Sequence, residues 1–338
     1  MRALFIGGTG IISSAITQVL HEYGWDLYLL NRGNRNDSLP KGTKILKCDI
    51  NDEKAVSELI KELHFDVVAD FIAFTPEHIE RDIRLFSGKT SQYIFISSAS
   101  AYQKPLSHYN ITESTPLSNP FWEYSRNKIA CEERLMQEYR NNGFPITIVR
   151  PSHTYDNRRI PLGVHGSNGS WQVAKRMLEG KPVIIHGDGS SLWTLTHNTD
   201  FAKGFIGLMG NIHAIGEAIH ITSDESLTWN QIYQIIADAL GVELKAVHIS
   251  SEFLSICGSK YDFNGSLIGD KSNTVVFDNS KLKRLVPGFN ATVRFDQGIR
   301  MLLDNVLSNP QLQENDPEFD AWCDKVISTY HLALEQIK

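Results

Sequence analysis

Tyr124 and Lys128 have side chains and a spacing that can support acid–base chemistry. They are four residues apart in the segment YSRNK at 124–128, and on a helix this spacing places both side chains on one face. A free tyrosine has a pKa of about 10 and is a poor base at neutral pH. An ammonium about 4 Å away stabilises a phenolate by about 4 kcal/mol at an effective dielectric of about 20, or about three pKa units. We therefore expect Tyr124, supported by Lys128, to exchange a proton with an alcohol.

Two serines precede this pair at the end of a predicted strand. The apolar run at 92–97 is followed by Ser98, Ala99 and Ser100. Hydroxyls at the carboxyl end of a strand lie where open α/β sheets bind ligands. Ser98 is thus a candidate for holding the reacting oxygen, and Ser100 for a second substrate contact. An ordinary polar strand end remains the alternative.

A glycine-rich turn occupies the start of the chain. Gly7-Gly8-Thr9-Gly10 and then Ile11-Ile12 join a predicted strand at 2–6 to a predicted helix at 11–23. Glycines let the backbone approach a pyrophosphate, and the helix N-terminus adds free N–H groups. We expect Gly7, Thr9, Gly10, Ile11 and Ile12 to contact a dinucleotide, although an ordinary strand–helix turn is the alternative. Ser13, where a third glycine is usual, is small enough to keep the packing.

The end of the second predicted strand bears on the choice between NAD and NADP. It reads Asn31-Arg32-Gly33-Asn34-Arg35, with no acid before Asp37. NAD-binding proteins tend to place a carboxylate here for the ribose 2′-OH, whereas arginines suit a 2′-phosphate. Asn31, Arg32 and Arg35 therefore favour NADP, unless both arginines are merely solvated. Asp49 and Ile50 follow the third strand, where Asp49 either accepts from the adenine amino group or caps the next helix.

The order of predicted elements supports this interpretation. Short apolar runs alternate with helical patterns up to residue 150, as in a parallel sheet with crossover helices covering both faces. Predicted strands lie at 2–6, 26–31, 44–48, 66–72, 92–97, 145–150, 182–186 and 217–222, and predicted helices at 11–23, 53–63, 76–87, 124–141, 171–179, 199–210, 228–240, 279–285, 294–307 and 317–336. Residues 151–170 read as a long loop.

We predict an α/β protein with a Rossmann-type doubly wound parallel sheet and a smaller C-terminal α/β substrate-binding domain. Residues 1–165 plus about 198–223 would form the NAD(P)-binding domain, and about 166–197 plus 224–338 the substrate domain. We also expect Ile72, Ala73 and Pro151, at the ends of further strands, to contact the cofactor.

The bulk composition excludes several classes of protein. The net charge of −6 disfavours nucleic acid as a partner, and no apolar stretch is long enough to span a membrane. The four cysteines are far apart, and no histidine pair has a metal spacing, so no metal is expected. No export signal is recognisable at the N-terminus, so we expect a cytoplasmic protein with a small-molecule substrate, either a monomer or a homodimer.

Taken together, these motifs resemble the extended short-chain dehydrogenase/reductase family of NAD-dependent epimerases and dehydratases that act on sugar nucleotides. The shared features are Gly7-Gly8-Thr9-Gly10, Asp49-Ile50, Ser97 to Tyr102, Tyr124 with Lys128, Arg150-Pro151, His186 to Ser190, Asp200 and Ser226 to Trp229. The resemblance implies Ser98, Tyr124 and Lys128 as catalytic residues, with Lys128 also contacting the nicotinamide ribose.

Four departures from the family pattern narrow this expectation. Ala99-Ser100 replaces the Asp-Glu of the dehydratases, which disfavours 4,6-dehydration. His153 stands where an asparagine usually holds the nucleotide sugar, and Trp193 where an arginine clamps the diphosphate; Arg158 or Arg159 is the expected substitute. The segment 73–91 is short and its helix polar, which argues against the usual family dimer.

These features predict an NAD(P)-dependent oxidoreductase or epimerase that acts at a carbinol carbon of a sugar or sugar-nucleotide-like substrate. The choice between a reductase and an epimerase stays open. The expected substrate contacts are Ser98, Ser100, Tyr124, His153, Arg159 and Trp193. The alternative is a non-catalytic nucleotide-sensing or RNA-binding member of the same fold, since the features also resemble a branch that includes chloroplast RNA-binding proteins.

Overall fold

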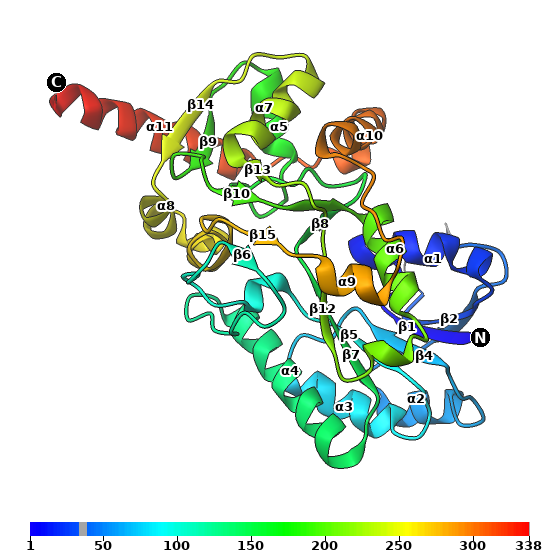
Figure 1. Cartoon of the computed structure of the whole chain (residues 1–338). Coiled ribbons are helices and arrows are strands. Elements are labelled where there is room, and N and C mark those ends of the chain that lie inside the picture. The colour runs from blue at the N-terminus through cyan, green and yellow to red at the C-terminus, as the bar shows by residue number, and fades with distance from the viewer. Residues whose placement is uncertain (34–38, 338) are drawn as a thin grey trace.

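A seven-stranded parallel sheet forms the centre of the protein, as the sequence predicts. The computed structural model describes residues 1–33 and 39–337. The strand order is β12-β7-β5-β4-β1-β2-β3, and every neighbouring pair is parallel (Figure 1). The strands are β1 (Arg2–Ile6), β2 (Asp26–Asn31), β3 (Lys44–Lys47), β4 (Val67–Asp70), β5 (Tyr93–Ile96), β7 (Ile146–Pro151) and β12 (Ala218–Ile221).

Helices cover both faces of this sheet, which explains its continuous apolar strands. One hydrophobic core lies between the sheet and helices α1 (Ile11–Val19), α6 (Asn198–Leu208) and α9 (Ser280–Leu285). A second core lies on the opposite face under α2 (Glu53–Leu59), α3 (Pro76–Phe86) and α4 (Glu123–Asn142) (Figure 1). Strands buried on both sides have no polar face and read as unbroken apolar runs.

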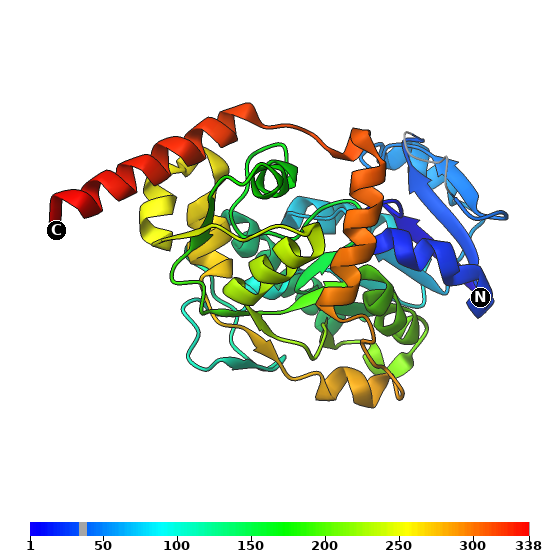
Figure 2. The ribbon, with the colours of Figure 1, turned by 90° about the horizontal axis from the view of Figure 1, so that it is seen from above.

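A third hydrophobic core belongs to the C-terminal half. It gathers side chains from α5 (Trp171–Leu178), α7 (Trp229–Leu240), α10 (Phe295–Ser308) and α11 (Pro317–Ile337), together with β9 (Val183–His186) and β14 (Ala246–Ile249). The last turns of α11 are exposed and project from the rest of the molecule (Figure 2). We propose that the two domains follow the boundaries predicted from the sequence.

Several short elements have no counterpart in the prediction. The expected loop at 151–170 contains β8 (His153–Tyr155), which pairs with β11 (Leu195–His197). The others include β6 (Asn110–Ile111), β10 (Leu192–Trp193), β13 (Leu227–Thr228), β14, α8 (Ser251–Cys257), β15 (Val276–Phe277) and a π-helix at 264–271. Segments of two or three residues carry too little periodicity for recognition, and π-helices are rare.

The strand order reverses between β1 and β4, and this places the ends of the central strands around one crevice. From β1 the chain moves outward to β2 and β3, and then returns to β4 and moves the other way. Doubly wound sheets bind ligands in the crevice at the carboxyl ends of their strands, at such a reversal. The predicted site residues lie at this edge.

Candidate functional site

The glycine turn after β1 forms one wall of a cavity of about 550 Å³. Gly7 adopts φ +83°, and a Cβ at this position would lie 2.5 Å from Cγ2 of Ile72, so no larger residue fits there. The Ser13 hydroxyl accepts from the Gly10 N–H and donates to the Gly7 carbonyl, both at 2.9 Å, which fixes the turn. The resulting open backbone surface before α1 fits the pyrophosphate of a dinucleotide.

Most of the predicted cofactor residues line this same cavity. It is bounded by Gly7, Thr9, Gly10, Asn31, Arg32, Asp49, Ile50 and Ile72, with Leu30, Cys48 and Asn51 in addition. Ile12 packs on the core under α1 instead of lining the cavity. Arg32 is exposed at the cavity rim. Arg35 lies outside the described residues.

Asp49 does not cap helix α2, so that alternative is wrong. The N-cap is Asp52, whose carboxylate accepts from the Ala55 N–H at 3.1 Å. Asp49 instead accepts from the Asn51 N–H at 2.9 Å and faces the cavity. The side chain three residues further along is the one that reaches the first turn of the helix.

A buried polar network holds the turn after β4. Asp70 accepts from the N–H groups of Ile72 and Ala73 at 2.6 and 2.9 Å, and pairs with Arg81 at 3.2 Å. Arg81 also bonds Asp82 at 2.8 Å and the Asn51 side chain at 2.9 Å. Arg81 and Asp82 are buried, so helix α3, although polar in sequence, turns part of its charge inward.

A second cavity, of about 270 Å³, lies beside the first and contains the candidate reacting groups. Ser98, Ser100, Tyr124, Pro151, His153 and Trp193, all predicted site residues, line it together with Ala99, Trp122, Ser152, Asp270 and Lys271. Ser98 and Ser100 hydroxyls are 2.8 Å apart, and the buried Ser125 donates to Ser100 at 2.7 Å. The structure therefore brings the serine strand end and the start of α4 together.

The acidity of Tyr124 differs from the expectation. Burial raises the pKa of Tyr124 to about 12, although its hydrogen bond with Ser98 acts in the opposite direction. Lys128 is also buried, and burial lowers its pKa to about 8. The direction of this shift is opposite to the lowering expected from Lys128, because removal of the phenol from water is the largest contribution to the pKa.

Lys128 is held firmly by the backbone of two strand ends. Its Nζ donates to the carbonyls of Ala73 and Ile96 at 2.6 and 2.7 Å, and lies 5.8 Å from the centroid of the Tyr124 ring. Ala73 is buried, and its backbone carbonyl is the group that contacts Lys128. An ammonium has three N–H donors, and the same Nζ also lies 4.6 and 4.8 Å from the ring centroids of Phe74 and Phe95.

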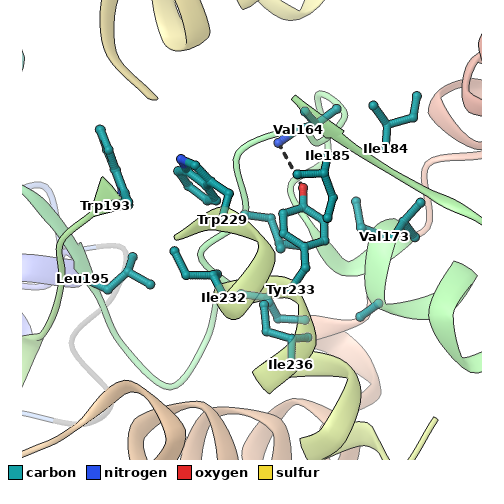
Figure 3. Close-up of a cluster of buried hydrophobic side chains, with 14 of the residues drawn as sticks. Val164, Val173, Ile184, Ile185, Trp193, Leu195, Trp229, Ile232, Tyr233 and Ile236 are labelled. Carbon is teal, nitrogen blue, oxygen red and sulfur yellow. Dashed lines mark hydrogen bonds between the residues drawn. The ribbon is translucent and has the colours of Figure 1, made fainter. Parts of the chain in front are cut away.

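His153 and Trp193 form a pair within the second cavity. Trp193 Nε1 donates to His153 Nδ1 at 3.1 Å, and burial lowers the pKa of His153 to about 3. Trp193 also packs against Trp229, with ring centroids 5.5 Å apart, at the edge of the C-terminal core (Figure 3). Trp193 is thus both a core residue and part of the cavity wall.

Four residues of this wall were not predicted from the sequence, namely Ser152, Trp122, Asp270 and Lys271. The last two end the π-helix at 264–271, which packs on Trp122 through glycines: a Cβ at Gly265 would lie 2.1 Å from Trp122 Cδ1. Trp122 contacts Tyr124 with centroids 4.9 Å apart. The only available signal was the pair of glycines four residues apart, which suits close packing but does not identify a partner.

Arg159 lies away from Tyr124. It is exposed and lines a third cavity of about 480 Å³, together with Arg158, Trp171, Gly10 and Ile11. The structure thus places the expected substitute for the diphosphate clamp next to the glycine turn, and not beside His153 and Trp193.

Within residues 1–33 and 39–337, no helix is both long and apolar enough to cross a membrane. In the same part of the chain, no cluster of three histidine, cysteine or acidic side chains is placed to hold a metal ion.

Comparisons with known proteins agree with this geometry. The chain is 24% identical over 289 residues to the 2′-dehydrokanamycin reductase of Streptomyces kanamyceticus. The matched region covers 86% of this chain and 80% of that protein. It is 27% identical to the chloroplast stem-loop binding protein of 41 kDa b of Arabidopsis thaliana, over 73% of this chain and 65% of that protein.

The fold is also similar to that of solved structures. The UDP-glucuronic acid 4-epimerase of Bacillus cereus in complex with NAD superposes with a TM-score of 0.71 at 20% identity, covering 93% of this chain and all of that chain (100%). The family model described as the NAD dependent epimerase/dehydratase family matches residues 3–222. The chain therefore belongs to the NAD-dependent epimerase/dehydratase family.

Proposed function

We propose that this protein is an NAD(P)-dependent oxidoreductase or epimerase that acts at a carbinol carbon of a sugar or sugar-nucleotide-like substrate. The observation that carries the proposal is the second cavity, where Ser98 and Tyr124 share one space above the buried Lys128. A hydroxyl anchor and a phenol in one cavity, with an ammonium near the phenol, suit proton exchange with an alcohol.

Each side chain has a distinct role in the proposal. Oxidation of an alcohol removes a proton from its oxygen and a hydride from its carbon, and reduction of the ketone reverses both transfers. Tyr124 takes or returns the proton, while Ser98 holds the reacting oxygen. Lys128 places its remaining N–H toward the cofactor ribose. A bound nicotinamide supplies or accepts the hydride, and its positive charge in the oxidised form favours the Tyr124 phenolate.

The cofactor residues in the proposal are Gly7, Thr9, Gly10, Asn31, Arg32, Asp49, Ile50 and Ile72, which line the first cavity. Ile11, Ile12, Ala73 and Pro151 stay in the proposal as expected from the sequence, although they do not line this cavity. We further propose a preference for NADP, supported by exposed Arg32 at the rim. Titration of the unfolding temperature with each cofactor tests this. Greater stabilisation by NADP, reduced in Arg32→Ala, is expected, and equal or greater stabilisation by NAD contradicts it.

His153 and Trp193 are the proposed substrate-recognition residues, with Ser100 beside them. Arg159 is proposed to act at the distal end of the substrate or at the cofactor pyrophosphate, since it lines the third cavity with Gly10. Replacement of the acid pair by Ala99 and Ser100 supports hydride transfer without loss of water.

The test of the proposed function is Tyr124→Phe, with Tyr109→Phe as the control because Tyr109 is 60% exposed. The probes are 2′-dehydrokanamycin, UDP-glucose and UDP-glucuronic acid, each with cofactor. We expect turnover by the wild type and the control, loss of turnover in Tyr124→Phe, and unchanged cofactor affinity in all three. Turnover that survives in Tyr124→Phe contradicts the mechanism. Cofactor binding by a wild type without turnover on any probe supports the non-catalytic alternative.

The same assay separates a reductase from an epimerase. A reductase consumes reduced cofactor in proportion to product. An epimerase reduces its own transient ketone, so that an inverted sugar accumulates while the cofactor absorbance stays constant.

A further inference from the structure

Lys271 stands out among the residues that line the Tyr124 cavity, because it is a nearly buried cation with poorly satisfied donors. Its side chain is 12% exposed. The contacts of its Nζ within the described residues are long: 3.4 Å to the Ser266 carbonyl, 3.9 Å to the Asp270 carboxylate and 5.9 Å to the centroid of the Trp122 ring. An ammonium with three donors and one long hydrogen bond has lost hydration without full replacement.

The position of Lys271 is fixed by its own backbone. Its carbonyl accepts from His186 Nε2 at 3.1 Å and from Trp229 Nε1 at 3.0 Å. Two residues earlier, the Gly269 carbonyl accepts from Asn119 Nδ2 at 2.7 Å. The end of the π-helix is therefore tied to both sides of the cavity, and π-helical turns are frequent at functional sites.

Two lysines share Asp270 as a nearby acid, and burial lowers the pKa of both lysines. Lys104 is a second buried lysine near Asp270, and its Nζ has no hydrogen-bond partner among the described residues. Asp270 is the carboxylate that lines the cavity, and Asp262, which also faces Lys271, is exposed and bonded to Trp122. Burial lowers the pKa of His153, so the imidazole adds no charge at neutral pH.

We propose that Lys271, backed by Lys104, binds an oxyanion of the substrate, a carboxylate or a phosphate carried by the same sugar ring as the reacting carbinol. A carboxylate or phosphate oxygen supplies the acceptors that the ammonium lacks, in a charge-assisted hydrogen bond. The anion belongs on the same ring because one cavity of about 270 Å³ contains both Tyr124 and Lys271, and this is below the usual size of sites for larger ligands. The proposal rests on the proposed function for the identity of the reacting group.

Equilibrium binding to the Tyr124→Phe protein saturated with NADPH tests this inference without turnover. The probes are D-glucuronate, D-glucose 6-phosphate, D-glucose and UDP-glucose, measured by titration calorimetry. We expect at least one anionic sugar to bind at least about 10-fold more tightly than D-glucose, and Lys271→Met to weaken it by about 10- to 100-fold. The comparison of glucuronate with the phosphate ester identifies which oxyanion the site prefers.

Two further variants guard against a trivial loss of binding. Lys271→Arg retains the cation and should retain most of the anion affinity. Lys260→Met removes a lysine that is 43% exposed and paired with Glu318, so it should leave binding unchanged.

The inference is overturned if neither anionic sugar binds, if D-glucose binds as tightly, or if the preference survives in Lys271→Met. Tight binding of UDP-glucose that depends on Lys271 also overturns it, because the anion would then be the diphosphate and not a group on the ring. Failure of the proposed function has a different signature, namely wild-type protein without Tyr124-dependent turnover while anion binding persists.

Discussion

Substitution of Trp193 by phenylalanine should remove the hydrogen bond that holds His153 in a single tautomer. An indole N–H can only donate, so the 3.1 Å contact with Trp193 makes His153 Nδ1 an acceptor and leaves the proton on Nε2. Among the described residues no group bonds that Nε2, and His153 lines the Tyr124 cavity. His153 thus offers a neutral N–H donor, for which we propose an oxygen of the substrate as the partner, and its lowered pKa argues against a role as a proton shuttle.

The size of the effect follows from the contact that is lost. Phenylalanine retains aromatic packing against Trp229 but cannot donate, so Nδ1 is left without its partner. An unsatisfied buried acceptor costs about 1 to 3 kcal/mol of unfolding free energy. Loss of a fixed donor to a neutral oxygen weakens substrate binding by about 1 kcal/mol, which corresponds to about a fivefold rise in KM. The change in kcat should be smaller, because Tyr124 and Ser98 are untouched.

Nitrogen-15 NMR of the histidine rings checks this directly. In the wild type we expect His153 to carry its proton on Nε2 and to stay neutral down to a pH of about 4, as its low pKa requires. In Trp193→Phe both tautomers should be populated. Trp171→Phe is the control, because Trp171 is also buried but donates to no histidine within the described residues.

Three results would refute the reasoning. The first is a wild-type His153 that titrates near its ordinary pKa, and the second is a proton on Nδ1. The third is a tautomer and a KM that do not change in Trp193→Phe.

Three further predictions concern the fold and the cofactor cavity. Gly7→Ala should abolish cofactor-induced thermal stabilisation and lower the unfolding free energy by more than about 1 to 2 kcal/mol. The control Gly24→Ala, also at positive φ but with no atom within 4 Å of its Cβ, should lower stability and leave cofactor binding intact. Equal effects of the two substitutions on cofactor binding would contradict the steric argument. Arg81→Met should cost about 3 to 5 kcal/mol in denaturant unfolding, because it leaves buried carboxylates without their counter-ion, and the exposed Arg84→Met should change little. Burial keeps His153 neutral in the folded state, so below a pH of about 6.5 the unfolded chain binds one more proton, and the unfolding free energy should fall as the pH drops. His153→Asn should flatten the dependence of the unfolding free energy on pH by about 1.4 kcal/mol per pH unit. An unchanged dependence would show that His153 is not protected from protonation.

The sequence carried most of the information about the sheet. Strands such as β1 and β4 are buried on both faces, so they appear as continuous apolar runs between glycines and helical patterns. The residues at their carboxyl ends then converge for topological reasons alone. This is why Gly7, Asp49 and Ser98 could be assigned to one edge without coordinates.

The wall of the Tyr124 cavity could not be predicted in the same way. Asp270 and Lys271 reach Trp122 across about 150 residues of sequence, and the segment NGSLIGDK has neither helical nor strand periodicity. The direction of the Tyr124 pKa shift could not be predicted for a related reason. Spacing along a helix gives the distance between two side chains but not the depth at which they are buried. Burial is set by the whole fold, and here it decides the sign of the shift.

The position of β12 affects how this chain can be made. The strand pairs with β7 at the edge of the sheet, yet it follows the segment that supplies α5 and β9 to the other core. During synthesis on the ribosome, the nascent chain cannot close its first sheet until residues 218–221 have emerged, after part of the second core has already been translated. A fragment ending near residue 165 would leave the β7 edge open for pairing with another chain. Premature termination is therefore expected to release an aggregation-prone N-terminal fragment, and the two cores should fold together.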